Sequence, residues 1–390
     1  MIRPIPNCSS CGACANICAR GAISMQLDSE GFYRPTIDAC KCVQCGACEK
    51  ICPWNKIVEN PNLADVSPKT IAAYAKDESI RMESSSGGIF TVLAKKIIED
   101  GGLVVGVAQL SPTRYGHIVA EKKEDLIRLR GSKYVQADAG LVYREVRARL
   151  ASGKKVLFSG APCQVAALYA VLGKAANADN LVTVDIVCHG TPSVKVFEKY
   201  VGELEKSHGA SLDSIGFRNK STGWNGYSLL HRFKDGEKTA IHHGRSKYMR
   251  LFLSRICQNT SCDNCLYRKL PRIADITLGD YWGISQYHPE MNDDKGTSVV
   301  LLNTKHGEEL FDSIADGIIQ CDSKIEYAIA GNPCIVRSDE QHAKRAEFFA
   351  DMDRCSLDEL VKRYCPYPST GKRLYYRVVG VLKKIKRKFL

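Results

Sequence analysis

The chain has 390 residues, more than one ordinary hydrophobic core accommodates, so two or three domains are expected. With 44% hydrophobic and 25% charged residues, the composition is that of a globular protein and excludes general disorder. The 18 cysteines are far more than an intracellular chain usually carries, and the net charge is +12. The first residues, MIRPIPNCSSCGAC, contain no apolar signal-peptide core, so we expect a cytoplasmic protein whose reduced cysteines bind metal.

The chain begins with an internal cysteine repeat. CSSCGACANIC at residues 8–18 and CVQCGACEKICP at residues 42–53 align on cysteine, with two, two and three residues between successive thiols. Between them, residues 21–38 contain two apolar strand-like pieces around a DSEG turn. Structural zinc is the alternative for any single pair of cysteines two residues apart, but two sets of four thiols in eleven residues favour iron–sulfur clusters.

This repeat resembles the bacterial two-cluster 4Fe-4S ferredoxins. In that spacing the fourth cysteine of each set binds the other cluster, so the resemblance implies two ligand sets. The first is Cys8, Cys11, Cys14 and Cys52, and the second is Cys42, Cys45, Cys48 and Cys18. Ala19 departs from the family, which usually has proline after this cysteine, whereas Pro53 keeps it.

The hydrophobic pattern of the sequence changes after the repeat. Residues 58–69 read as a linker, and beyond them β-rich runs at 70–76, 101–110, 154–160 and 181–188 alternate with helical patterns. This alternation predicts an α/β domain with a substantially parallel sheet. After about residue 190 the pattern becomes α+β, with expected antiparallel strands at 214–219, 227–233 and 239–244. We therefore expect a ferredoxin-like module at 1–57, followed by an α/β domain with a mixed sheet in two parts, 70–190 and 191–345.

Two short motifs of the central domain are candidates for cofactor binding. The SSSGG turn at residues 84–88 precedes a helix, and its free N–H groups and hydroxyls suit a phosphate. Ser86, Gly87 and Gly88 are the candidate residues, although a helix N-cap at Ser86 is the plainer reading. Lys133 in GSKYVQAD follows a short helix and is suited to a phosphate or the edge of a flavin, or is an ordinary surface lysine.

The later cysteines suggest a third cluster. Cys163 and Cys188 follow two neighbouring expected strands, and Cys262 and Cys265 form a further pair two residues apart. These four thiols are one complete ligand set, with Cys257 as the alternative to Cys163. Two other readings stay open: a catalytic Cys163–His189 dyad, and thiols that are merely buried small side chains. Cys40, Cys321, Cys334, Cys355 and Cys365 show no ligand spacing.

Five motifs in this order resemble the coenzyme F420 hydrogenase/dehydrogenase beta-subunit family: SSSGGIFTVLA, GSKYVQAD, LFSGAPCQVAAL, VDIVCHGTPS, and CDNC followed by RIADITLGDYWG. The resemblance implies FAD in the central domain, a 4Fe-4S cluster nearby and electron transfer between the clusters and a hydride or electron carrier. Lys133 would act on the flavin, and Ser86, Gly87 and Gly88 would hold its pyrophosphate. Related members act on the deazaflavin coenzyme or on chlorophyll derivatives, or belong to bacterial polysaccharide gene sets, and the last branch is the one that this chain suggests.

The C-terminal tail, residues 366–390, is basic. It carries eight Lys and Arg residues and no acidic residue, with apolar side chains at near-helical spacing. It is typical of an amphipathic helix that binds an anionic membrane surface at the inner face of the membrane or an acidic partner, with a disordered terminus as the alternative. The rest of the chain lacks a basic stripe, so nucleic acid is not an expected partner.

Three functions follow from these patterns. The first is an iron–sulfur flavin oxidoreductase with its own small substrate and a redox partner. The second is an electron-transfer subunit whose substrate chemistry belongs to a partner chain. The third is a thiol hydrolase or acyltransferase that uses Cys163 and carries structural clusters.

Overall fold

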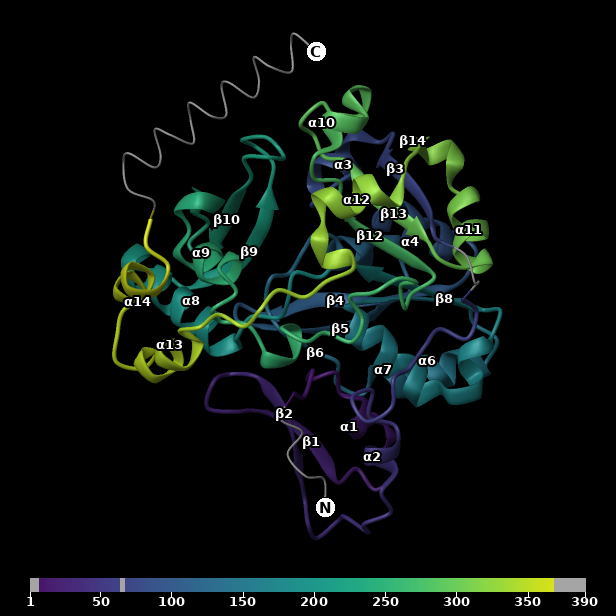
Figure 1. Ribbon diagram of the computed structural model, residues 1–390, viewed down its shortest axis with the longest axis horizontal. Coiled ribbons are helices and arrows are strands. Elements are labelled where there is room, and N and C mark those ends of the chain that lie inside the picture. Colours follow the sequence, from purple (N-terminus) through teal and green to yellow (C-terminus); the bar gives the residue numbers. More distant parts are fainter. Residues whose placement is uncertain (1–6, 64–66, 368–390) are drawn as a thin grey trace.

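The ferredoxin-like module lies at one end of the molecule (Figure 1), and the computed structural model describes residues 7–63 and 67–367. The module consists of α1 (Ala13–Ile17), β1 (Ile23–Leu27), β2 (Tyr33–Ile37) and α2 (Ala47–Lys50). Its two strands pair antiparallel around the expected DSEG turn, where Asp28 Oδ1 accepts hydrogen bonds from two backbone N–H groups. Gly12 and Gly46 start the two helices with φ of 78° and 71°, a conformation that favours glycine.

The main body is built on one nine-stranded sheet. Its order is β14-β3-β13-β12-β8-β7-β4-β5-β6. The strands are β3 (Lys69–Ala75), β4 (Leu103–Ser111), β5 (Arg114–Ala120), β6 (Ala137–Asp138), β7 (Val156–Gly160), β8 (Leu181–Ile186), β12 (Ile276–Asp280), β13 (Ser298–Leu302) and β14 (Ile318–Asp322). The pairs β4–β7, β7–β8, β8–β12 and β5–β6 are parallel and the other four are antiparallel. The expected mixed sheet is therefore confirmed, and both parts of the chain contribute strands to it.

Helices cover both faces of this sheet (Figure 1). Because side chains alternate along a strand, Val105 of β4 packs on one face and Val104 on the other. The first face is covered by α6 (Val142–Ala151), α7 (Pro162–Leu172), α10 (Ile284–Tyr287) and α12 (Ile325–Gly331). The second face is covered by α4 (Ile89–Glu99), α5 (Leu126–Leu129) and α11 (Lys305–Asp312), and α3 (Glu78–Glu83) follows β3.

A second, smaller sheet forms a lobe of its own. β9 (Leu212–Asn219), β10 (Ser228–Phe233) and β11 (Lys238–His242) pair antiparallel, as the pattern predicted. Around them pack α8 (Val194–His208), α9 (Lys247–Leu253), α13 (Arg345–Asp351) and α14 (Leu357–Tyr364), with an aromatic-rich core. Short 3-10 turns connect the elements: η1 (Lys123–Asp125), η2 (Gly173–Asn177), η3 (His243–Arg245), η4 (Thr260–Cys262), η5 (Pro289–Met291), η6 (Ala315–Gly317) and η7 (Pro333–Ile335).

Two features of the chain bear on membrane binding, the basic tail and the length of the apolar helices. The basic amphipathic pattern lies almost entirely in residues 368–390, outside the described residues, so the tail stays a prediction. Within the described ranges, no helix is long and apolar enough to cross a membrane.

Candidate iron–sulfur and cofactor sites

The first predicted ligand set lies together in the module. Burial raises the pKa of Cys11 to about 12, and the neighbouring Cys8 and Cys52 add to this rise. Burial also raises the pKa of Cys14, with further contributions from Cys11, Cys8 and Cys52. These effects of the thiols on one another's pKa require all four to lie near one another, including Cys52 from the second copy of the cysteine repeat. A thiol with a raised pKa needs a cation to become a thiolate, and iron would supply that charge.

The second set lies nearer the surface. Cys45 is exposed, whereas Cys18, Cys42 and Cys48 are half-buried. Burial raises the pKa of Cys48, with Glu49 and Cys45 contributing. Cys18 Sγ accepts a hydrogen bond from Ala22 N at 3.3 Å, the kind of N–H···S contact that tunes clusters. The second set is therefore the more accessible of the two sets in the module.

The later cysteines meet in one cavity. Cys163 follows β7 at the start of α7, and Cys188 follows β8, the parallel neighbour of β7. Cys262 and Cys265 come from the η4 segment, and all four thiols line the same cavity. Cys257 instead lies in the core of the smaller lobe, where burial and Cys365 raise its pKa to about 12. The geometry favours Cys163 over Cys257 as the fourth member of the set.

The cavity also presents unused hydrogen-bond donors. Arg268 lines it and donates from its second terminal nitrogen to Cys188 O at 3.0 Å. Its Nε and remaining terminal nitrogen are buried and have no hydrogen-bond partner among the described residues. Burial alone would lower the pKa of Arg268, but the nearby thiols of Cys188, Cys334, Cys265 and Cys262 outweigh it and raise the pKa. A buried cation with free donors facing four thiols fits an anionic iron–sulfur cluster.

The module is next to this cavity. Ser9 and Trp54 of the module line it together with the four cysteines. Tyr143 of α6 donates its hydroxyl to Cys11 O at 2.8 Å, and Cys11 is close enough to affect the pKa of Cys163. The first ligand set and the cavity are therefore neighbours across a thin layer of side chains.

Specific polar contacts hold the module against the body. Asn259 donates to Cys8 O at 3.1 Å, and Asn16 donates to Gly140 O at 2.8 Å. Arg345 makes a bidentate ion pair with Glu30, at 3.0 and 2.6 Å. These contacts involve buried or half-buried groups, so the module is docked firmly rather than tethered.

The SSSGG turn, GSKYVQAD and GDYWG meet at a second place. Ser132 N donates to Ser85 Oγ at 2.7 Å, which joins the first two motifs. The guanidinium of Arg218 joins them to the third, because it donates to Ser85 O at 3.3 Å and to Asp280 Oδ1 at 3.0 Å. Burial alone would lower the pKa of Arg218, but the Asp280 carboxylate prevails and raises it.

The candidate phosphate residues have partners within the protein. Ser86 donates its hydroxyl to Thr297 O at 2.9 Å, and Gly87 N donates to Ser298 Oγ at 3.0 Å. A Cβ at Gly87 would lie 2.4 Å from Ala73 O, so close packing on β3 explains this glycine. Gly88 starts α4 with a φ of 86°. A phosphate role for the turn stays a prediction. Among the described residues, Arg218 Nε and Arg130 Nε are buried donors without a hydrogen-bond partner.

Lys133 caps the short helix before it. Its Nζ donates to Leu129 O at 2.7 Å and to Arg130 O at 2.9 Å. Burial lowers the pKa of Lys133 to about 7, so this amine exchanges a proton near neutral pH.

Sequence reasoning missed the residues that surround these motifs. Trp224 donates its Nε1–H to Asp280 Oδ1 at 2.7 Å and stacks on Trp282, with ring centroids 4.9 Å apart. Lys220 donates to three backbone carbonyls, among them Ser86 O at 2.6 Å. In the sequence, Trp224 is an ordinary tryptophan and Lys220 is an ordinary basic residue at the end of a strand. Only their burial in the folded protein distinguishes them from other residues of these types.

The structure disfavours a Cys163–His189 dyad. His189 Nε2 is buried without a hydrogen-bond partner among the described residues. Burial raises the pKa of Cys163 well above its usual value and lowers that of His189 to about 4. Both shifts oppose the thiolate–imidazolium pair that such a nucleophile requires.

Three family models match the chain. The 4Fe-4S dicluster domain matches residues 7–56. The models of the N-terminal and C-terminal parts of the coenzyme F420 hydrogenase/dehydrogenase beta subunit match residues 70–141 and 153–327, together more than half of the chain.

Individual proteins are similar over most of their length. The uncharacterized protein MJ1349 of Methanocaldococcus jannaschii is 23% identical over 361 residues, which cover 82% of this chain and 90% of that protein. Among solved structures, a chain of the F420-reducing NiFe hydrogenase complex from Methanosarcina barkeri is 20% identical, with a TM-score of 0.47. That likeness covers 79% of this chain and 95% of the other.

The dicluster module and the mixed α/β body define an iron–sulfur oxidoreductase subunit. The chain belongs to the coenzyme F420 hydrogenase/dehydrogenase beta-subunit family.

Proposed function

We propose that the protein is an iron–sulfur flavoprotein oxidoreductase that passes electrons between 4Fe-4S clusters and a hydride or electron carrier, through FAD. The observation that carries this proposal is the cavity lined by Cys163, Cys188, Cys262 and Cys265 directly beside the ferredoxin-like module. A thiol-lined cavity next to a two-cluster module suits a chain of closely spaced redox centres.

The proposed ligands are the twelve cysteines of three sets. The first set is Cys8, Cys11, Cys14 and Cys52, the second is Cys18, Cys42, Cys45 and Cys48, and the third is Cys163, Cys188, Cys262 and Cys265. When bound, 4Fe-4S clusters accept and release single electrons, and a flavin exchanges a hydride or an electron pair. Backbone N–H groups and Arg268 stabilise the negative charge of the clusters, for example through Thr191 N on Cys262 Sγ at 3.3 Å.

The flavin proposal rests on the place where three motifs meet. Ser86, Gly87 and Gly88 at the start of α4 would face the pyrophosphate, and the donors of Arg218 and Arg130 would supply positive charge. Lys133, with its pKa near 7, would hold or release a proton at Nζ beside the flavin.

Anaerobic purification with iron, sulfide and flavin analysis tests this function. Three clusters require about twelve irons per chain, and the flavin reading requires one FAD. Eight irons or fewer and no flavin would overturn both the third cluster and the flavin. A flavin retained by the wild type and lost after Arg218→Met would support the proposed place of binding, whereas retention after this change would contradict it.

A second candidate is an electron-transfer subunit without its own substrate. The accessible second set supports it, because Cys45 is exposed and a partner chain docked on it would be close to that cluster. Turnover by the isolated chain with reduced deazaflavin coenzyme or with reduced nicotinamide separates the two readings. Reduction of the clusters by either carrier supports the enzyme, and no reduction without a partner chain supports the subunit.

The cellular setting is also a proposal. The sequence patterns suggest a cytoplasmic protein that is bound peripherally to the inner face of the membrane through its tail. The family resemblance suggests a link to bacterial polysaccharide biosynthesis. Flotation with anionic liposomes, with and without residues 370–390, tests the tail. Equal binding of both forms would contradict a membrane role for it.

A further inference from the structure

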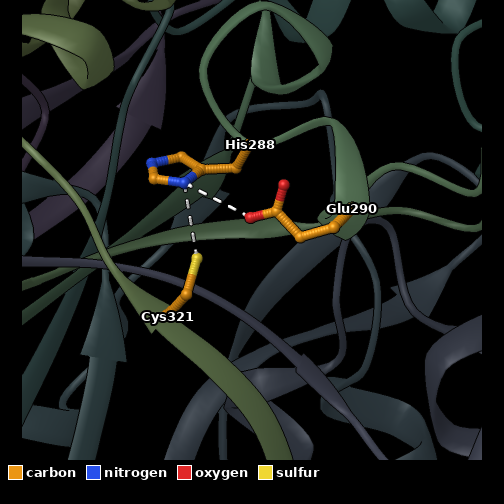
Figure 2. Close-up of side chains that lie close together, drawn as sticks. All are labelled: His288, Glu290 and Cys321. Carbon is orange, nitrogen blue, oxygen red and sulfur yellow. Dashed lines mark hydrogen bonds and ion pairs between the residues drawn. The ribbon is translucent and has the colours of Figure 1, made fainter.

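Three metal-ligating side chains converge at the edge of the main sheet, away from the cysteine sets described above. His288 follows α10, Glu290 lies in the adjoining η5 turn, and Cys321 lies on the edge strand β14 (Figure 2). His288 Nδ1 is 3.6 Å from Cys321 Sγ and 3.6 Å from Glu290 Oε1. One donor atom of each residue lies within 4.8 Å of the other two.

We propose that these residues form a mononuclear Zn²⁺ site. Tetrahedral zinc, with bonds of about 2.0–2.1 Å to nitrogen or oxygen and about 2.3 Å to sulfur, separates its ligand atoms by roughly 3.3–3.8 Å. The two measured separations fall in this range. The third separation, from Cys321 Sγ to the Glu290 carboxylate, is at most 4.8 Å, so a modest side-chain movement brings all three atoms to an ion.

The histidine is already oriented for ligation. Its Nε2 lies 2.8 Å from Ser323 Oγ, and Ser323 is itself hydrogen-bonded to the Tyr281 hydroxyl. With Ser323 Oγ accepting from Nε2–H, the ring proton sits on Nε2 and the Nδ1 lone pair is left for an ion between Cys321 and Glu290. Metal-binding histidines are held in this way by a partner on the other ring nitrogen.

A catalytic triad does not explain the arrangement. In a nucleophile–histidine–acid triad, the nucleophile and the carboxylate contact different ring nitrogens. Here the thiol and the carboxylate both face Nδ1, and Nε2 faces a serine. Three donors directed at one point indicate a shared cation.

The donor types select the ion. One imidazole, one thiolate and one carboxylate match Zn²⁺, whereas Mg²⁺ and Ca²⁺ prefer oxygen ligands only. Binding replaces the Cys321 thiol proton by the Zn–S bond and releases that proton to solvent. The side chain of Glu290 is 63% exposed, so water reaches the fourth position. The ion ties the edge strand β14 to the segment that follows Tyr281.

Zinc binding is tested on the full chain, purified anaerobically with its iron retained and then dialysed against Zn²⁺ alone. We expect one zinc per chain, with a zinc-edge X-ray absorption shell of one sulfur and three nitrogen or oxygen atoms. His288→Gln and Cys321→Ser each weaken zinc binding about tenfold or more, while Cys355→Ser, a half-buried thiol elsewhere, leaves it unchanged.

Unchanged iron content in each variant shows that the clusters and the fold are intact. If His288→Gln or Cys321→Ser loses iron, Glu290→Gln is measured in its place, because the exposed side chain of Glu290 is not needed for folding. Equal zinc binding by the wild type and Cys321→Ser would overturn the site. A zinc shell with more than one sulfur would also overturn it, since that zinc would occupy cluster cysteines.

Discussion

At the scale of single residues, two buried arginines lie at the places where cofactors are proposed, and the cysteine spacing does not reveal them. Arg268 lines the cysteine-lined cavity, and two of its donors have no partner in the part of the chain that the structure describes. Arg218 joins three motifs through Ser85 and Asp280. Their burial requires compensation by negative charge, which the thiolates of a bound cluster would supply to Arg268 and which the Asp280 carboxylate supplies to Arg218. The sequence could not predict these roles, because an arginine that is buried reads the same as one that is exposed.

Arg268 is expected to raise the reduction potential of the third cluster. A positive charge and hydrogen bonds near the sulfurs stabilise the reduced, more negative state. Arg268→Met should lower this potential on the order of tens of millivolts in a redox titration followed by electron paramagnetic resonance. Lys269→Met is the control, because this neighbouring side chain is 44% exposed and screened by solvent. An unchanged potential in Arg268→Met would contradict the assignment.

Lys133 is expected to react as a neutral amine near pH 7. Burial lowers its pKa to about 7, so the reactive unprotonated fraction rises through neutral pH instead of near pH ~10.4. Acetic anhydride labelling from pH 6 to 11, read by peptide mass spectrometry, gives the midpoint. Lys305, whose side chain is 86% exposed, is labelled in the same reactions as the control. Equal midpoints for the two lysines would show that Lys133 is not perturbed.

At the scale of elements, the sequence predicted what depends on local pattern. The two cysteine bursts, the DSEG hairpin, the alternating strands and helices of residues 70–188 and the three antiparallel strands all lie where the pattern placed them. The addition of β12, β13 and β14 to the main sheet was not predicted, since it depends on contacts between distant segments. The choice between Cys163 and Cys257 likewise required the fold, because both spacings are plausible along the chain.

The turn before α4 is expected to tolerate no side chain at Gly87. A Cβ there would lie 2.4 Å from Ala73 O and 2.9 Å from Ser298 N, both backbone atoms of the sheet. Gly87→Ala should destabilise the fold by about 1–3 kcal/mol and lower the midpoint of thermal unfolding. Gly202→Ala is the matched control in α8, where no atom lies within 4 Å of the added Cβ, and it should be neutral or stabilising. Equal midpoints for the two variants would refute the packing argument.

At the scale of the whole molecule, the position of the docked ferredoxin-like module explains how the proposed redox centres are arranged. Polar contacts from the smaller lobe and from α6 hold the module, which lies at one end of the molecule (Figure 1). Its first ligand set lies near the cavity, and its second set is the more accessible one. A rigid arrangement of this kind keeps the distances between redox centres short and constant. In the proposed electron path, the third set would connect the clusters of the module to the body.

The iron content of Cys188→Ser, beside that of the wild type and of Cys355→Ser, tests this connection most directly. Cys188 lines the cavity, and Cys355 is a half-buried thiol of the smaller lobe outside every proposed ligand set. Anaerobically purified Cys188→Ser should contain about four irons fewer than the wild type, with the module's clusters intact, while Cys355→Ser keeps the full content. Wild-type iron content in Cys188→Ser would contradict the third cluster and the proposed path between module and body.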